Sequence, residues 1–101
     1  MYNISKEEWK KRISEDANAV ILDVRTPQEW SEGVMPNTLK IDIMASDFME
    51  KANELDKSKS YYVYCRSGGR SGQACNVLES LGCSAAFNLI GGVMSWDEEL
   101  V

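Results

Sequence analysis

Histidine is absent from this sequence, and its absence excludes several kinds of catalytic site. Neither a Ser-His-Asp triad nor a Cys-His pair can form, and metal sites that include histidine are excluded as well. Cysteine is scarce: Cys65, Cys75 and Cys83 are separated by ten and eight positions, which matches neither a zinc ribbon nor a Cys-x-x-Cys redox pair. We therefore expect no metal and no organic cofactor. An odd number of cysteines without a secretory signal favours free thiols in a reducing compartment.

An excess of basic charge and long apolar runs are also missing. The formal net charge of -5 speaks against a general nucleic-acid-binding surface, so any anion site must be local. No apolar run approaches the roughly 18 residues that a membrane-spanning helix needs. The segment Met1–Glu8 has neither the basic stretch nor the apolar stretch of a secretory signal. We expect a cytoplasmic monomer with no membrane partner and no nucleic-acid partner.

The remaining composition is that of a globular protein. The 101 residues are enough for one domain, which we expect to span residues 1–101. With 44% hydrophobic and 27% charged residues, the chain is too apolar to be disordered. Short strand-like and helix-like stretches alternate along it. This alternation predicts an α/β fold with three layers, α/β/α, and a mostly parallel sheet of about five strands.

Local signals place the individual elements. Ser5 with Glu8 and Thr26 with Glu29 form capping-box patterns, and Ser46 is a candidate cap for a third helix. Helices are expected over residues 6–14, 27 to about 33, 47 to about 55, from about 72 to 81, and in a short segment after 92. Strands are expected over residues 19–24, 39–43, 61–64 and 86–90. The apolar character of the first and third of these strands indicates that they are central and buried.

The segment Tyr61–Ser71 carries the clearest chemical signal. A strand ends there, Cys65 follows at once, and a loop with adjacent glycines leads into a helix. Ligands of open α/β sheets bind beyond the carboxyl ends of the strands, and the N–H groups of such a loop can converge as a cradle for an anion. A thiol in this cradle is expected to have a lowered pKa and to react as the thiolate. Arg66 and Arg70 add positive charge to an otherwise acidic chain.

The three cysteines differ in their expected roles. Cys65 could simply be a small apolar residue that closes a core strand, but the glycine loop and the flanking arginines favour a reactive thiol. Cys75 lies on the apolar stripe of the following helix, and Cys83 lies at a helix-to-strand turn. Packing is therefore the expected role of both, and neither is expected to form a disulfide with Cys65.

Four segments, in order along nearly the whole chain, give this sequence a resemblance to the rhodanese family of sulfurtransferases. They are Ile21–Arg25 with its Asp-x-Arg ending, Glu29–Pro36, the loop Cys65–Arg70, and the Leu-x-Gly-Gly-x-x-x-Trp signature within Asn88–Trp96. The resemblance implies that Cys65 is the catalytic nucleophile. It also implies that the rest of the loop binds the substrate, that is Arg66, Ser67, Gly68, Gly69 and Arg70.

The resemblance includes one informative match and one local departure. Within this fold it implies that six-residue loops serve sulfur chemistry and seven-residue loops serve phosphate or arsenate chemistry, and Cys65–Arg70 has six residues. Val34 and Asn37 stand where the family ordinarily has histidine and glycine. That histidine is taken to be structural, so its loss affects local packing rather than chemistry. Asn37 can still adopt left-handed backbone angles, as glycine would.

Asp23 is a charged residue at the end of an apolar strand, where a buried carboxylate needs a partner. We expect that partner to be Arg70, at the far side of the loop, and we expect Arg25 to pair with Glu29 or Glu32. Asp23 and Arg25 are assigned to support of the loop, not to catalysis. The alternative is that these are surface charges of little energetic weight.

The implied function is sulfur transfer by double displacement. The Cys65 thiolate takes the outer sulfur of a small anionic donor such as thiosulfate, and the resulting persulfide passes it to cyanide or to a thiol, including a thiol of a protein partner. Two alternatives remain open. One is a non-catalytic rhodanese-like interaction module, although such modules commonly lack the cysteine. The other is a Cys-dependent phosphatase or arsenate reductase, against which the loop length argues.

Overall fold

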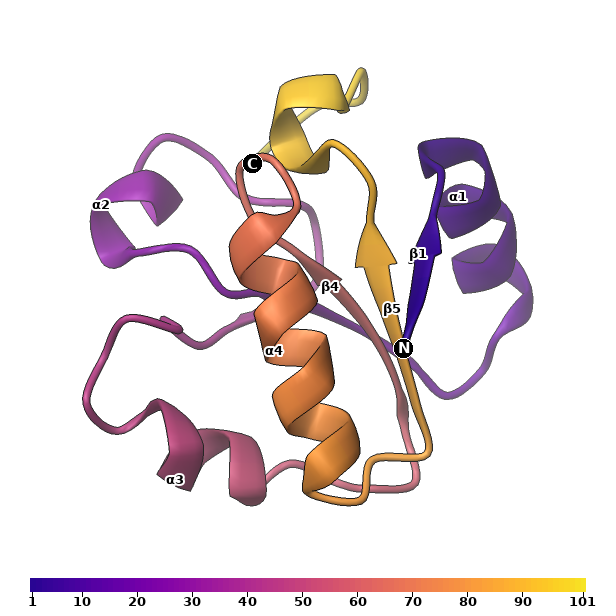
Figure 1. Ribbon diagram of the computed structural model, residues 1–101. Coiled ribbons are helices and arrows are strands. Elements are labelled where there is room, and N and C mark those ends of the chain that lie inside the picture. Colours follow the sequence, from indigo (N-terminus) through magenta and orange to yellow (C-terminus); the bar gives the residue numbers. More distant parts are fainter.

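A computed structural model describes residues 1–101, in which helices cover both faces of a five-stranded sheet (Figure 1). The strand order is β1-β5-β4-β2-β3, and every neighbouring pair is parallel. The strands are β1 (Tyr2–Ile4), β2 (Ala19–Asp23), β3 (Thr38–Lys40), β4 (Ser60–Tyr64) and β5 (Ala85–Leu89). The helices are α1 (Lys6–Glu15), α2 (Pro27–Trp30), α3 (Phe48–Asn53), α4 (Gly69–Ser80) and the 3-10 helix η1 (Gly92–Ser95). The expected three-layer α/β class is confirmed.

The middle strand is β4, which lies between β5 and β2. Its residues alternate between the two faces of the sheet. Tyr61, Val63 and the following Cys65 belong to the core under α3 and α4, whereas Tyr62 and Tyr64 belong to the core under α1. Each of these five residues is at most 1% exposed. A continuous apolar run is needed because a central parallel strand is covered on both sides.

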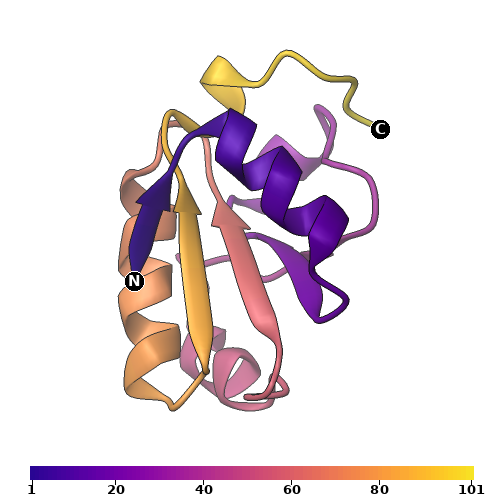
Figure 2. The same ribbon diagram turned by 90° about the vertical axis from the view of Figure 1, so that its right-hand side faces the viewer.

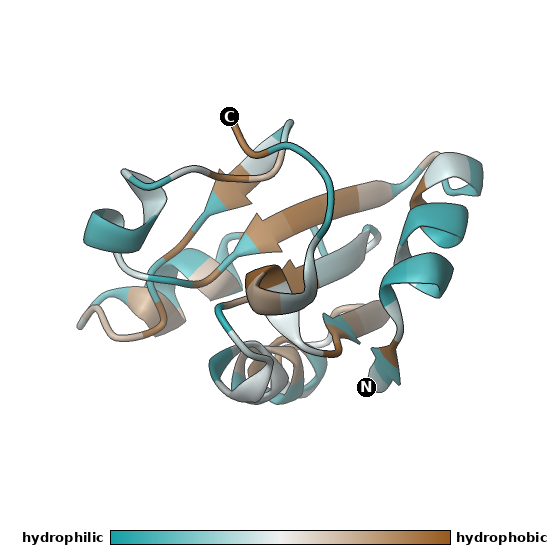
Figure 3. Cartoon of the chain, turned by 90° about the horizontal axis from the view of Figure 1, so that it is seen from above, coloured by the Kyte–Doolittle hydropathy of each residue, from teal (hydrophilic) through white to brown (hydrophobic).

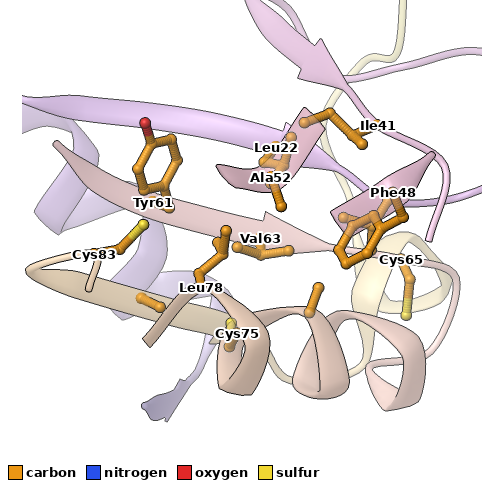
Figure 4. Close-up of a cluster of buried hydrophobic side chains, with 13 residues drawn as sticks. Leu22, Ile41, Phe48, Ala52, Tyr61, Val63, Cys65, Cys75, Leu78 and Cys83 are labelled. Carbon is orange, nitrogen blue, oxygen red and sulfur yellow. The ribbon is translucent and has the colours of Figure 1, made fainter. Parts of the chain in front are cut away.

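Two apolar cores stabilise the layers on either side of the sheet. Figure 4 shows the first, in which Leu22 and Val63 of the sheet face Phe48 and Ala52 of α3 and Leu78 of α4. On the opposite face, Trp9 of α1 packs edge-on against the rings of two β4 tyrosines. Figure 2 shows the sheet between α4 and α1, and Figure 3 shows apolar residues gathered in the central strands while α1 and α2 are mostly polar.

The helix caps largely follow the sequence. The Ser5 side chain accepts from the Glu8 N–H at the start of α1, and both bonds of the Thr26–Glu29 capping box form at the start of α2. The Glu8 carboxylate pairs with Arg12 instead of returning to the Ser5 backbone. The expected cap at Ser46 is wrong by one residue, because α3 begins after Asp47, whose side chain makes no capping bond.

Several boundaries differ from the expectation. The strand β1 was not expected, because three residues carry too little pattern, and it exists through pairing with Phe87–Leu89 at the edge of the sheet. The expected strand 39–43 is shorter in the structure, where β3 ends at Lys40, although the Ile41 and Ile43 N–H groups still donate to the carbonyls of Asp23 and Val24. The C-terminal helix is one 3-10 turn. No helix of the structure combines the length and the apolar character that crossing a membrane requires.

The departure from the family pattern near Val34 is accommodated by the backbone. Asn37 has a φ of 58°, so it takes the left-handed conformation expected of it. Val34 exchanges two backbone hydrogen bonds with the C-terminal Val101, of 2.9 and 2.7 Å. The Val34 segment is therefore tied to the chain end through its backbone, and this tie does not depend on the side chain at that position.

Candidate active site

Cys65 lies directly after β4, at the carboxyl edge of the parallel sheet, where the loop into α4 begins. The loop turns at Gly68, which has a φ of 112°, a left-handed conformation that favours glycine. The Cys65 side chain continues the alternation of β4 and forms one end of the first core (Figure 4). It is 1% exposed, so the thiol lies at the bottom of the loop rather than on the surface.

Hydrogen-bond donors of the loop converge on the sulfur. The Gly68 N–H donates to Cys65 Sγ at 3.1 Å, and Ser71 Oγ lies 3.3 Å from the same sulfur. Burial raises the pKa of the thiol, but the Ser71 hydroxyl and the N–H groups of Ser71, Gly68 and Ser67 stabilise the thiolate more strongly. The net result is a Cys65 pKa below its ordinary value, as the sequence predicted.

The hydroxyl that contacts the sulfur is also part of a buried network of polar side chains. Ser71 Oγ also lies 2.5 Å from Asn88 Oδ1, and the Asn88 side-chain amide donates to the Gly68 carbonyl at 3.1 Å and to Asn3 Oδ1 at 2.9 Å. These bonds tie the loop to β5 and, through Asn3, to the unexpected strand β1. Sequence reasoning named Ser71 only as a continuation of the loop and gave Asn88 no role. The only signal was a polar residue within an otherwise apolar strand.

The backbone of the C-terminal signature, just after the Gly91-Gly92 pair, is hydrogen-bonded to the start of the loop. Val93 N–H donates to the Cys65 carbonyl and Met94 N–H donates to the Arg66 carbonyl, both at 3.0 Å. A Cβ on Gly92 would lie 2.4 Å from the Cys65 carbonyl oxygen, and the residue has a φ of 54°. The signature therefore works by close approach of two backbones, which no side chain at Gly92 would allow.

The expected ion pairs are wrong. Arg70 forms a two-point pair with Glu29 of α2, with N–O distances of 2.7 and 2.9 Å, and not with Asp23. The Arg70 hydrogen bond holds the pKa of the Glu29 carboxyl at about 2. The physical reason is that Arg25 already donates to both Asp23 oxygens, so Arg70 pairs with a carboxylate of α2 instead, where both side chains stay partly exposed, at 28% and 24%.

Asp23 pairs instead with Arg25, two residues along the same strand end. The Arg25 guanidinium donates to both Asp23 oxygens, at 2.8 to 3.1 Å, and its backbone N–H donates to Oδ1 at 2.9 Å. The same guanidinium donates to the Gly33 carbonyl at 2.7 Å. The pair thus holds the segment after α2. We expected it to support the cysteine loop, but its hydrogen bonds do not reach that loop.

A polar cavity of about 550 Å³ opens beside the loop. Arg66 forms part of its wall, together with Arg25 and with residues of α2 and its flanks. The other lining residues are Thr26, Gln28, Glu29, Glu32, Val93 and Met94. Arg66 is exposed and forms no ion pair within the protein. The remaining loop residues Ser67 and Gly69 are exposed as well, so this end of the sheet presents the cradle to solvent.

The other two cysteines are packed in the core, as expected (Figure 4). Cys75 is fully buried on α4, and its burial raises the pKa of the thiol to about 12. Burial also raises the pKa of Cys83. None of the three cysteines is in a disulfide. No cluster of three or more cysteine, aspartate or glutamate side chains has the spacing of a metal site.

Comparison with known proteins places this geometry in a family. The profile of the rhodanese-like domain matches residues 5–99. A protein of Allochromatium vinosum named sulfurtransferase is 32% identical over 93 residues, which cover 92% of this chain and 85% of that protein.

Two solved structures are similar over the whole chain. The rhodanese-like domain protein of Staphylococcus aureus superposes with a TM-score of 0.86 at 33% identity, covering 100% of this chain and 97% of that one. The rhodanese-related protein of Thermoplasma volcanium gives 0.85 at 31%, covering 100% and 98%. The chain belongs to the rhodanese-like domain family, and at the level of that family its activity is that of a sulfurtransferase.

Proposed function

We propose that Cys65 carries the transferred sulfur as a persulfide. The observation that supports this most is the convergence of the Gly68 N–H and the Ser71 hydroxyl on Sγ at the carboxyl edge of the sheet. Donors that stabilise a thiolate also stabilise a terminal sulfur anion, because both carry one negative charge on sulfur. The outer sulfur of a persulfide would lie about 2 Å beyond Sγ, toward the mouth of the loop.

The reaction has two displacement steps. In the first, the Cys65 thiolate attacks the outer sulfur of thiosulfate, the S–S bond of the donor breaks, and sulfite leaves with the bonding electron pair. In the second, a cyanide or thiolate acceptor attacks the outer sulfur of the persulfide, and the Cys65 thiolate is the leaving group. The charge balances in each step, so no redox partner is needed. The exposed Arg66 attracts the anionic donor to the loop.

Phosphate or arsenate chemistry is disfavoured by the position of Arg70 as well as by the loop length. Catalysis of phosphoryl transfer needs positive groups placed on the equatorial oxygens of the transferred group. Here both terminal nitrogens of the Arg70 guanidinium are bound by Glu29, so they are already engaged within the protein. A non-catalytic interaction module is disfavoured because the donors around Cys65 stabilise a charged sulfur that such a module would not require.

A reducing compartment such as the cytoplasm fits the same proposal. Double displacement needs a free thiolate at Cys65, and the other two thiols are buried with raised pKa values. An oxidising compartment would promote capping or oxidation of the single low-pKa thiol, because susceptibility follows thiolate character.

Intact mass spectrometry after thiosulfate treatment tests the proposal. The protein is expected to gain the mass of one sulfur atom, and Cys65→Ser is expected to gain none while keeping its fold. Cys75→Ala is the matched control, since it removes a thiol of the same core and should still gain the sulfur. Persulfide formation on the Cys65→Ser variant would show that another residue is the nucleophile.

A further inference from the structure

The side-chain amide of Asn88 is the polar group that ties the cysteine loop to β5. Asn88 is 5% exposed and lies on the same face of the strand as Ala86, a residue of the first core. Its amide nitrogen donates to the Gly68 carbonyl at 3.1 Å and to Asn3 Oδ1 at 2.9 Å. A carbonyl can only accept, so the nitrogen must face Gly68 and the amide oxygen must face Ser71 Oγ, 2.5 Å away. The amide is therefore held in one orientation.

The Ser71 hydroxyl has one proton and two partners within reach, the amide oxygen of Asn88 and Cys65 Sγ. While the sulfur is a neutral thiol, which is a weak acceptor, the hydroxyl donates to the amide oxygen. When the sulfur is a thiolate, the hydroxyl turns to the sulfur, because hydrogen bonds to charged groups are stronger. The amide oxygen then loses the donor that satisfied it, and a buried acceptor without a donor costs free energy. Ionisation of Cys65 is thus coupled to Asn88 through one proton.

The charged and titratable groups around the loop do not take part in this coupling. Arg66 is exposed, and both terminal nitrogens of Arg70 are bound by Glu29. The Cys75 thiol is buried on α4, and its pKa of about 12 keeps it neutral. The N-terminal ammonium pairs with a carboxylate of the same helix. The Ser71 hydroxyl is hydrogen-bonded to none of these groups, so the sulfur and the amide oxygen alone compete for its proton.

We propose that Asn88 is a positioning residue for sulfur transfer, which holds the Ser71 hydroxyl when Cys65 Sγ is uncharged and releases it when Sγ carries a charge. Its effect on transfer rests on the function proposed above. When the thiolate takes the outer sulfur of the donor, sulfite leaves with the bonding electron pair and the negative charge moves from Sγ to the outer sulfur. Sγ is then neutral, and the hydroxyl returns to the amide oxygen. Asn88 therefore destabilises the free thiolate relative to the persulfide and favours loading.

A double-mutant cycle on Asn88→Leu and Ser71→Ala tests this coupling. Leucine has nearly the shape of asparagine but accepts no hydrogen bond. The acid dissociation constant of Cys65 is taken from the pH midpoint of iodoacetamide alkylation, so no persulfide is needed. Asn88→Leu is expected to raise this constant by a factor about fivefold larger with Ser71 present than in the Ser71→Ala background, the scale of one net hydrogen bond. Loss of the Gly68 contact affects both backgrounds and cancels. The same factor in both backgrounds would overturn the inference.

Asn3→Ala is the matched control, because it removes one bond of the same amide but neither of its contacts with the loop. This variant is expected to leave the acid dissociation constant of Cys65 unchanged. A change as large as that of Asn88→Leu would mean that loss of any bond to the amide perturbs the loop, which contradicts a specific role of the amide oxygen. Asn88→Val, which is smaller and suits a β-strand, replaces Asn88→Leu in the cycle if the leucine variant does not fold.

The two transfer steps supply a second readout, at a pH where Cys65 is fully ionised. Compared with its effect in the Ser71→Ala background, Asn88→Leu should be loaded by thiosulfate about twofold more slowly and discharged by cyanide about twofold faster. The reason is that a more stable thiolate is a poorer nucleophile and a better leaving group. A merely structural role would change both steps in the same direction, which would contradict the proposal. If the alkylation cycle shows the coupling but no persulfide forms, the coupling stands and the function proposed above fails.

Discussion

Replacement of Ser71 by alanine should make the Cys65 thiol less acidic. The Ser71 hydroxyl has one proton and two acceptors within reach, Cys65 Sγ at 3.3 Å and Asn88 Oδ1 at 2.5 Å. When the sulfur is a thiolate, the Ser71 hydroxyl donates preferentially to the sulfur, because hydrogen bonds to charged groups are stronger than those to neutral groups. Removing the hydroxyl therefore destabilises the thiolate. The pKa of Cys65 rises, because burial raises this pKa and fewer hydrogen bonds then counteract it.

Loss of the Ser71 hydroxyl should change the rate at which Cys65 is alkylated. A hydrogen bond to a charged group contributes about 1.5–3 kcal/mol, and the long contact to sulfur and the competition from Asn88 argue for the lower end. About 1.4 kcal/mol reduces the thiolate fraction tenfold at low pH. A more basic thiolate is also a better nucleophile, by roughly threefold for this change, at a Brønsted coefficient of about 0.4–0.5. Alkylation of Cys65 should thus be about threefold slower at low pH.

The pH dependence of alkylation distinguishes this effect from a loss of structure. At high pH, where both proteins are fully thiolate, the variant should react about threefold faster than the wild type, so the two rate profiles cross. Ser67→Ala is the matched control, since its hydroxyl belongs to the same loop but makes no hydrogen bond to the sulfur. Iodoacetamide kinetics followed by intact mass would measure both. Parallel profiles that never cross would refute the assignment of Ser71 as a donor to the thiolate.

Three further predictions concern packing and charge. Gly92→Ala should abolish sulfur transfer and lower the free energy of unfolding by about 2–4 kcal/mol, because its Cβ would meet a loop carbonyl at 2.4 Å. Measurements of the transfer rate and of denaturation check this, and near-normal activity would contradict it. Glu29→Gln removes the partner of Arg70 and should cost about 1–2 kcal/mol above pH 4.5. A folded pKa of about 2 means that this difference shrinks as the pH falls from 4.5 toward 2, and urea titrations across that range would show a constant difference if the pair contributed nothing. Cys75→Ala and Cys83→Ala should each cost about 1 kcal/mol and leave turnover unchanged, and loss of turnover without unfolding would mean that a second thiol takes part.

Much of the scaffold followed from local sequence signals. The apolar run before Cys65 indicated a central strand because a parallel strand covered on both faces must be apolar on both sides. The capping pattern at Thr26 placed the start of α2, since those bonds join residues three apart and need no distant partner. The cysteine at a strand end, followed by glycines, indicated the cradle, because parallel strands all present their carboxyl ends at one edge.

The partners within the site were decided by the tertiary structure. Arg70 and Glu29 are 41 residues apart and meet only because α2 lies beside the loop. Asn88 reaches Ser71 across 17 positions because β5 neighbours β4 in the sheet, and Asn3 joins them only through the short edge strand β1. Sequence pattern indicates which residues need a partner, since a buried polar group must be satisfied. Which partner satisfies it depends on how the elements pack, and that is a property of the folded chain as a whole.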